Sequence, residues 1–260
     1  MTTAVALTDV AEYLDTLLRT AEVPDYAGAV NGIQVENGAP IMRVAVAVDA
    51  CLQTIHGAID SGANLLIVHH GLFWSGVQPL RGRIYRRFQL LIANDVAVYS
   101  SHLPLDLHPT LGNNALLAHA LGLEPRGGFA RFQTVHVGAT GTADISTTSL
   151  LHGAEVIARA HGGTVVAVGV HADRRTRRWA VCSGAGASSE TLREAAECGV
   201  DTLIVGEGPQ HTAVEAMELG IAVLYVGHYA TETFGVRALG ANLEQRFGLP
   251  WSFVGAPTGL

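Results

Sequence analysis

The stretch IAVLYVGHYATETFGVRALG, residues 221–240, predicts a buried strand that leads directly into a helix. Its first six residues are apolar and rich in β-branched side chains, which is typical of a strand inside a sheet. The run stops at Gly227, and apolar residues return at helical spacing from about Thr231. His228 and Glu232 lie four residues apart across this corner, so the two side chains can converge on one point, as metal ligands do.

Two further apolar runs end in polar side chains. LLIVHHGLFW (65–74) presents His69 and His70, and VAVYSSHLPLD (96–106) presents His102 and Asp106. Open α/β sheets place their chemistry at the carboxyl ends of their strands. We therefore expect these three strand ends to share one rim.

Strand-like and helix-like segments alternate along the chain, which predicts an α/β fold with mainly parallel sheets in three α/β/α layers. The segment LEPRGGF (123–129) interrupts both periodicities and divides the chain into two α/β lobes of similar size, 1–125 and 126–260. In this interpretation the last part, about 200–260, can pack back on the first lobe. The metal site is expected between the lobes, at the carboxyl ends of strands.

The composition predicts a protein with a sizeable core and no membrane span. The chain has 260 residues, of which 48% are hydrophobic, but its longest apolar runs are too short to cross a bilayer. With no charged-then-apolar leader either, we expect a cytoplasmic protein. A net charge of -7 and a sequence pI near 5.9 argue against a nucleic-acid partner, which needs a basic face.

The sequence contains no lysine, because all 16 basic residues are arginine. This excludes a Schiff-base lysine, a lysine general base and a P-loop lysine. The three cysteines, Cys51, Cys182 and Cys198, are too few and too scattered for a disulfide framework or a CxxC site. The twelve histidines are thus the chief remaining polar chemistry.

A single histidine at a strand end is most often a hydrogen-bonded structural residue, so the candidates are weighed as a group. Two adjacent imidazoles after a buried strand need partners, and carboxylates at equivalent strand ends favour a metal site. The predicted ligands are three histidines and two carboxylates: His69, His70, Asp106, His228 and Glu232. They exceed one tetrahedral structural zinc and suit two divalent ions, which this donor set allows to be Zn, Fe, Mn or Co.

Several other motifs allow two interpretations each. The arginine clusters Arg81–Arg87 and Arg174–Arg178 either grip a phosphate or form solvated loops and inter-subunit contacts. The glycine-rich turn CSGAGASSET (182–191) either binds an anion or is a plain tight turn with a helix cap. Glu207 and His211 either support the metal ligands from outside or are structural.

Six blocks, in order over nearly the whole chain, carry a resemblance to a known family. They are NGIQV (31–35), LLIVHHGLFW (65–74), SSHLPLD with GNNALLA (100–118), CSGAGAS (182–188), VGEGPQH (205–211) and GHYATETFGVRALG (227–240). Together they resemble the dinuclear-metal-centre hexamer family, which is named after a yeast transcription-factor interactor. Its bacterial members are commonly labelled GTP cyclohydrolase type-two homologues, and this chain resembles a short member.

The resemblance implies the same five ligands, two divalent ions per subunit and a toroidal homohexamer whose metal sites face an interior cavity. It also implies that His102, Glu207 and His211 lie near the site. Where many relatives have TGE this chain has Val205-Gly206-Glu207, which removes one hydroxyl there.

The implied function is a metal-dependent hydrolase that attacks a nucleotide-like small molecule with a metal-bridging water. The choice of substrate rests on the family label alone, and no catalytic side chain is identified. The alternative is a non-catalytic hexameric protein that binds, delivers or senses metal.

Overall fold

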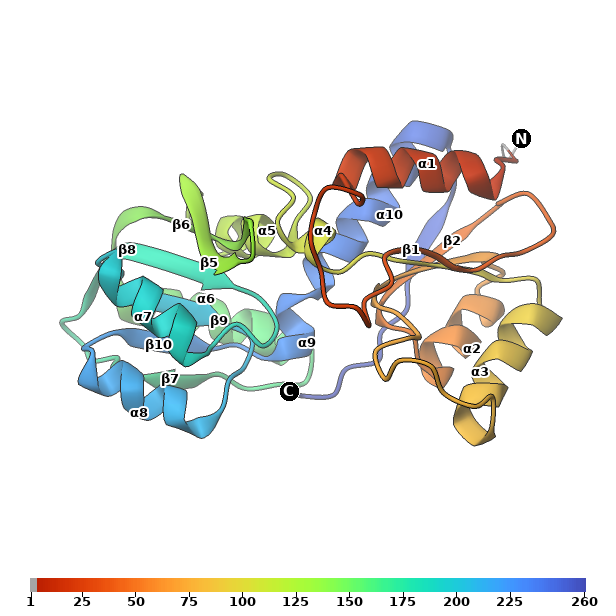
Figure 1. Ribbon diagram of the computed structural model, residues 1–260. Helices are drawn as coiled ribbons and strands as arrows, with labels where there is room; N and C mark the ends of the chain where they lie inside the picture. Colours follow the sequence, from red (N-terminus) through yellow and green to blue (C-terminus); the bar gives the residue numbers. More distant parts are fainter. Residues whose placement is uncertain (1–3) are drawn as a thin grey trace. The chain divides into compact units, whose positions relative to one another are not determined.

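Two β-sheets flanked by helices organise residues 4–260, the part of the chain that this computed structural model describes (Figure 1). The predicted α/β class with two lobes is confirmed. The chain forms two compact units, of which unit 1 runs up to Leu105 and includes Gly235–Ala256. Unit 2 consists of Asp106–Phe234 and Pro257–Leu260. Residues 106–125 thus fall in unit 2 and residues 235–256 in unit 1, whereas the sequence suggested a lobe boundary at 125/126.

Unit 1 contains a five-stranded sheet and three helices of its own. Its elements are α1 (Leu7–Leu18), β1 (Gly32–Val35), β2 (Val44–Asp49), α2 (Leu52–Asp60), β3 (Leu65–His70), α3 (Gly82–Ala93), β4 (Ala97–Ser100) and β11 (Trp251–Phe253). Two further helices, α4 (Leu103–Asp106) and α10 (Thr233–Phe247), run across the unit boundaries.

The strand order in unit 1 is β1-β4-β3-β2-β11, and every neighbouring pair is parallel except β1 with β4. The central strands are buried along almost their whole length, because helices cover both faces. Figure 1 shows α1 and α10 on one face and α2 and α3 on the other. Ile55 of α2 and Leu91 of α3 pack against alternate residues of β2, β3 and β4.

Unit 2 contains a six-stranded sheet. Its elements are α5 (Asn113–Ala120), β5 (Gly127–Phe132), β6 (Val135–Ser146), α6 (Thr147–Ala160), β7 (Val166–Val168), β8 (Arg175–Cys182), α7 (Ser189–Glu197), β9 (Thr202–Val205), α8 (Gln210–Glu218), β10 (Ala222–Tyr225) and α9 (His228–Thr231).

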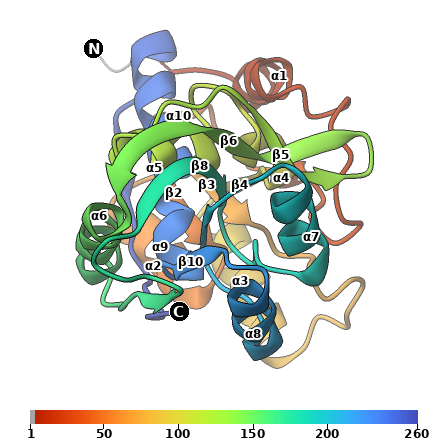
Figure 2. The same ribbon diagram turned by 90° about the vertical axis from the view of Figure 1, so that its left-hand side faces the viewer.

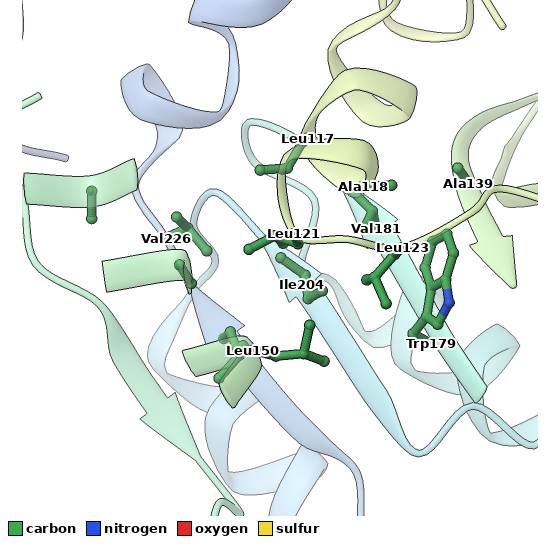
Figure 3. Packing of buried hydrophobic residues seen from close by; sticks show 13 residues of the cluster. Leu117, Ala118, Leu121, Leu123, Ala139, Leu150, Trp179, Val181, Ile204 and Val226 are labelled. Carbon is green, nitrogen blue, oxygen red and sulfur yellow. The ribbon is translucent and has the colours of Figure 1, made fainter. Parts of the chain in front are cut away.

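The sheet of unit 2 separates two hydrophobic clusters. Trp179 and Val181 of β8 point toward one face and pack with residues of α5 and α6 (Figure 3). Ala180 and Cys182 point to the other face, where they pack with residues of α7 and α8. Figure 2 likewise shows α6 on one side of the strands and α7 and α8 on the other. The alternation of buried side chains across β8 therefore produces the three layers that the sequence predicted.

The prediction of mainly parallel sheets holds for unit 1 but is wrong for unit 2. The order there is β5-β6-β8-β9-β10-β7, and only β8 with β9 and β9 with β10 are parallel. The segment 123–129, which we expected to be a break, includes the start of β5, which pairs with β6 as an antiparallel hairpin. Among residues 4–260, no helix combines the length and apolarity that crossing a membrane requires.

Candidate metal centre

The carboxyl ends of three parallel strands in unit 1 bring polar side chains to one edge of the sheet. Strand β2 ends at Asp49, which is paired in register with His70 at the end of β3. Strand β4 ends at Ser100, opposite Val68, and His102 follows two residues later. Neighbouring parallel strands end together, so the edge gathers His69, His70 and His102.

The three imidazoles form a compact group, which we call the tri-histidine cluster. One ring nitrogen of each residue lies within 4.8 Å of the others. The ring centroid of His69 is 4.7 Å from that of His70 and 4.9 Å from that of His102. His69 is fully buried, whereas the other two are partly exposed. Imidazoles at this separation are suited to bind a divalent cation in common.

Hydrogen bonds fix which nitrogen of each imidazole can serve as a ligand. His69 Nδ1 lies 3.0 Å from the carbonyl oxygen of Ser101, which can only accept, so Nδ1 carries the proton. His70 Nδ1 lies 2.9 Å from Asp49 Oδ1, and His102 Nδ1 lies 2.8 Å from Asp25 Oδ1. In the neutral rings the lone pair is therefore on Nε2, the arrangement typical of metal-binding histidines whose other nitrogen is held by an oxygen.

Asp25 holds His102 from a loop that precedes β1. Its carboxylate accepts hydrogen bonds from the side chains of His102 and Asn31 and from the backbone N–H groups of Tyr26 and Leu103. Burial raises the pKa of Asp25, but the hydrogen bond and charge of His102, with the other donors, outweigh burial and lower it overall. Asp25 is thus an ionised acceptor that fixes the orientation of the His102 ring.

Unit 2 presents a second group at the carboxyl edge of its own parallel strands. The last residues of β8, β9 and β10 are in register, and Ser183, Glu207 and His228 follow them. The turn after β10 is made by Gly227, whose φ of 110° is unfavourable for other residues. The helix begins at His228 rather than near Thr231 as predicted, and Glu232 lies between α9 and α10.

His228 is held between two carboxylates. Its Nδ1 is 2.8 Å from Glu207 Oε1, and its Nε2 is 3.2 Å from Oε2 of the buried Glu232. The expected convergence of His228 and Glu232 is thus confirmed. Burial lowers the pKa of His228, but hydrogen bonds and charges from Glu232 and then Glu207 outweigh it and raise the pKa to about 9.

We expect His228 in the metal-free protein to titrate with a midpoint of about 9, compared with its ordinary value of 6.5. Because the folded-state pKa is raised, the stabilisation from its charged form is complete below about 6.5 and is lost as the pH rises through 9. NMR titration of the His228 ring protons tests this, with a lower midpoint expected in Glu232→Gln. A midpoint near 6.5 in the wild-type protein would contradict it.

Asp106 and Glu232 lie on either side of the short segment Ser183-Gly184. Ser183 Oγ donates to Asp106 Oδ1 at 3.2 Å, and Asn113 Nδ2 donates to the same oxygen at 2.8 Å. Gly184 has a φ of 60°, and a Cβ atom there would lie 3.2 Å from His228 Nε2 and would collide with Glu232 Oε1. Only glycine at position 184 therefore leaves room for the side chains of His228 and Glu232.

The neighbouring thiol of Cys182 packs among apolar side chains at the end of β8. Burial, together with the negative charges of Asp106, Glu232 and Glu194, raises its pKa to about 12 in the metal-free protein. The predicted donors in unit 2 are a histidine and carboxylates. Imidazole and carboxylate groups fit zinc, iron, manganese and cobalt, so the residues present suit a divalent transition metal.

Comparisons with known proteins show which family the chain belongs to. The model of the Duf34/NIF3 (NGG1p interacting factor 3) family matches residues 5–256. The chain belongs to the Duf34/NIF3 family. The GTP cyclohydrolase 1 type 2 homolog of Deinococcus radiodurans is 40% identical to it over 253 residues, which cover 97% of this chain and 94% of the relative. The homolog from Halobacterium salinarum is 41% identical over 255 residues, covering 97% and 100% respectively.

Solved structures show the same fold. Protein ybgI, whose function is given as unknown, superposes with a TM-score of 0.88 at 33% identity and covers 98% of this chain and 100% of its own. TTHA1606 from Thermus thermophilus superposes with a TM-score of 0.81 at 34% identity, with the same coverage. The fold shared with these proteins therefore extends over nearly the whole described chain.

In this Duf34/NIF3 protein the predicted site residues fall into two groups. His69 and His70 belong to unit 1, where the structure adds His102 to them as a possible ligand. Asp106, His228 and Glu232 belong to unit 2, with Glu207 as the partner of His228. His211 is exposed on the first turn of α8. That the five predicted ligands bind metal stays a prediction.

Two residues of the site were not selected from the sequence. Asp49 ends a buried strand, which is the same signal that marked His70, but its carboxylate was not assigned to the site. Asp25 lies in a loop and gives no periodic signal at all. Both aspartates hold an imidazole ring. An acidic residue at the end of a buried strand is the signal by which Asp49 could have been identified.

The arginines of the second cluster bind protein groups. Arg174 donates to the carbonyl oxygens of Asp201 and Gly220, and Arg175 pairs with Asp144 at 2.6 Å. Arg178 donates to the carbonyl oxygen of Cys198 at the end of α7. These contacts favour the structural interpretation of this cluster. The cluster Arg81–Arg87 forms the start of α3, and both interpretations of it stay predictions.

Proposed function

We propose that this Duf34/NIF3 protein binds two divalent metal ions and hydrolyses a nucleotide-like small molecule. The ligands would be His69, His70, Asp106, His228 and Glu232, with His102 able to join the first two. The observation that carries the proposal is the tri-histidine cluster, in which each Nδ1 lies within hydrogen-bond distance of an oxygen, so that Nε2 is the nitrogen that could serve as a ligand. Histidines that bind a metal almost always have their other ring nitrogen held by an oxygen in this way.

Hydrogen bonds from neighbouring side chains hold the proposed metal ligands in fixed orientations. Asp49, Asp25 and Glu207 fix the rings of His70, His102 and His228, and Ser183 with Asn113 fixes the carboxylate of Asp106. When bound, a pair of divalent ions supplies a water of lowered pKa and a positive charge that stabilises a developing oxyanion. This equipment suits hydrolysis of a C–N, ester or phosphate bond.

The names of the relatives support the choice of substrate. The Deinococcus radiodurans and Halobacterium salinarum proteins are both called GTP cyclohydrolase 1 type 2 homolog. We extend this to a nucleotide-like substrate here, and we propose a cytoplasmic homohexamer as the working assembly. The identity of the metal is left to experiment among zinc, iron, manganese and cobalt, because affinity order alone does not choose between them.

Replacing Glu232 with glutamine tests the proposal. The protein would be prepared with each of the four metals and screened for turnover of GTP, other nucleotides and simple phosphoesters. We expect turnover by the wild type and its loss, by more than about 100-fold, in Glu232→Gln, because the change removes a buried charged ligand. The metal content of each protein would be measured alongside.

Glu218→Gln is the matched control, since Glu218 is exposed at the end of α8 and should tolerate the change. Tight metal binding with no turnover on any substrate would refute the hydrolase and support a metal-binding or metal-delivery protein instead. Wild-type turnover that survives Glu232→Gln would show that the ligand assignment is wrong.

A further inference from the structure

Two exposed aromatic side chains border the tri-histidine cluster in unit 1. Trp74 is 38% exposed and Tyr26 is 54% exposed. The ring centroid of Trp74 is 4.7 Å from that of His102 and 5.8 Å from that of His70. Tyr26 lies 6.0 Å from His102, measured in the same way. Large aromatic surface left in water next to a polar cluster is characteristic of a ligand-binding site.

The backbone holds the Trp74 segment firmly in this position. Gly28 packs so closely that a Cβ atom there would lie 3.0 Å from both Cα and the carbonyl oxygen of Trp74. Gln34 accepts a hydrogen bond from the backbone N–H of Leu72 at 2.6 Å. On the other side, the ring of Phe73 packs against Phe88 of α3, with 6.1 Å between centroids. These contacts fix the position of the backbone that carries Trp74.

Tyr26 is tied to the same histidine that Trp74 touches. Its backbone N–H donates to Asp25 Oδ1 at 2.7 Å, and the same oxygen is 2.8 Å from His102 Nδ1. The loop that carries Tyr26 is thus anchored to the tri-histidine cluster through one carboxylate. A site whose parts are fixed in advance binds without first ordering them.

The ring planes have an orientation that suits a flat ligand. Tyr26 and Trp74 are 6.3 Å apart between centroids and tilted by 53°, so they form two inclined walls and are not stacked on one another. Trp74 meets His102 at 80° and His70 at 79°, which places the imidazoles perpendicular to the indole. A planar ring stacked on Trp74 would therefore also be close to perpendicular to the two imidazoles.

We propose that Trp74, assisted by Tyr26, is a stacking surface for a purine-type heteroaromatic ring of the substrate, and that it places this ring beside the tri-histidine cluster. Aromatic side chains stack with the π-face that every nucleobase offers, whereas their partially negative faces offer nothing to a phosphate group. The inference rests on the proposed function, since it names the part of a nucleotide-like substrate that unit 1 recognises. It makes Trp74 a positioning residue for the ring, outside the set of metal ligands.

The test is equilibrium binding of guanosine to the zinc-loaded full-length chain, measured by calorimetry, with ribose 5-phosphate as a ligand that lacks the ring. We expect Trp74→Leu to weaken guanosine binding by about 5- to 150-fold, the range that corresponds to loss of one base-stacking contact. Binding of ribose 5-phosphate should not change. Trp74→Phe should keep guanosine affinity within about threefold, because it retains an aromatic face.

Tyr85→Leu is the matched control, since Tyr85 is 50% exposed on α3 and is not among the aromatic residues that border the cluster. Guanosine affinity that is unchanged in Trp74→Leu, or equally weakened in Tyr85→Leu, would overturn the inference. So would a wild-type protein that binds ribose 5-phosphate but not guanosine. Guanosine binding that depends on Trp74, combined with no turnover of any substrate in the screen described above, would support the inference while refuting the hydrolase, so the two failures are distinguishable.

Discussion

Replacing His69 with alanine is expected to lower the zinc affinity of the protein by more than about 100-fold. Loss of an outer hydrogen-bond partner of a metal ligand costs roughly 10- to 100-fold, and loss of a ligand itself should cost more. His69 is the most buried member of the tri-histidine cluster, with no exposed surface. Its Nδ1–H donates a hydrogen bond to the carbonyl oxygen of Ser101. Competition with a chelator of known affinity, followed by calorimetry, would measure the change.

His56→Ala supplies the control, because His56 is exposed on α2 and should leave zinc affinity unchanged. Because the His69 ring is buried, the variant's far-UV circular dichroism and melting temperature must be compared with those of the metal-free wild type. His102→Ala, at a half-buried position, should weaken zinc binding in the same direction without creating a core cavity. A folded His69→Ala protein with wild-type zinc affinity would exclude the tri-histidine cluster as a metal site.

The part of the fold that the sequence predicted well is the parallel sheet of unit 1. Strands β2, β3 and β4 are buried on both faces, so each appears in the sequence as an unbroken apolar run between helical segments. The same is true of β9 and β10 in unit 2. Polar residues directly after such runs were good indicators of the site, because the carboxyl ends of parallel strands meet at one edge.

The pairing of β5 with β6 was not predicted, because the glycines at the start of β5 serve packing and not chain reversal. At Gly128 a Cβ atom would lie 2.6 Å from Cβ of His136 on the neighbouring strand β6. Glycines in a strand at such close approaches weaken the alternating pattern by which strands are found. The sequence of this region therefore suggested a break where the structure has a long antiparallel pair.

The outer partners of the histidines show a second limit of sequence-based reasoning. Asp25 and His102 are 77 positions apart, and Asp25 lies in a loop whose conformation no periodicity describes. Its role depends entirely on the tertiary contact. Local spacing in the sequence already placed His228 near Glu232 and His69 beside His70. Asp25, by contrast, could be found only from the folded chain.

Replacing Trp179 with alanine is expected to reduce the free energy of unfolding by about 3–5 kcal/mol, the usual cost of removing a buried aromatic side chain. Trp179 is fully buried on β8, within the cluster that also contains Leu123, Ala139 and Leu150 (Figure 3). Gly141 lies against the indole, and a Cβ atom there would be 2.6 Å from Cζ2. Since glycine has no side chain that could move into the space, the cavity would stay largely open.

Urea unfolding monitored by far-UV circular dichroism would measure this loss, which is a large share of the roughly 5–15 kcal/mol that stabilises a typical domain. Val156→Ala is the matched control, because Val156 lies on α6 of the same unit but is 55% exposed, and its truncation should change stability by less than about 0.5 kcal/mol. A reduction below about 1 kcal/mol for Trp179→Ala would mean that the indole is not enclosed as described, because cavity formation alone costs more than that.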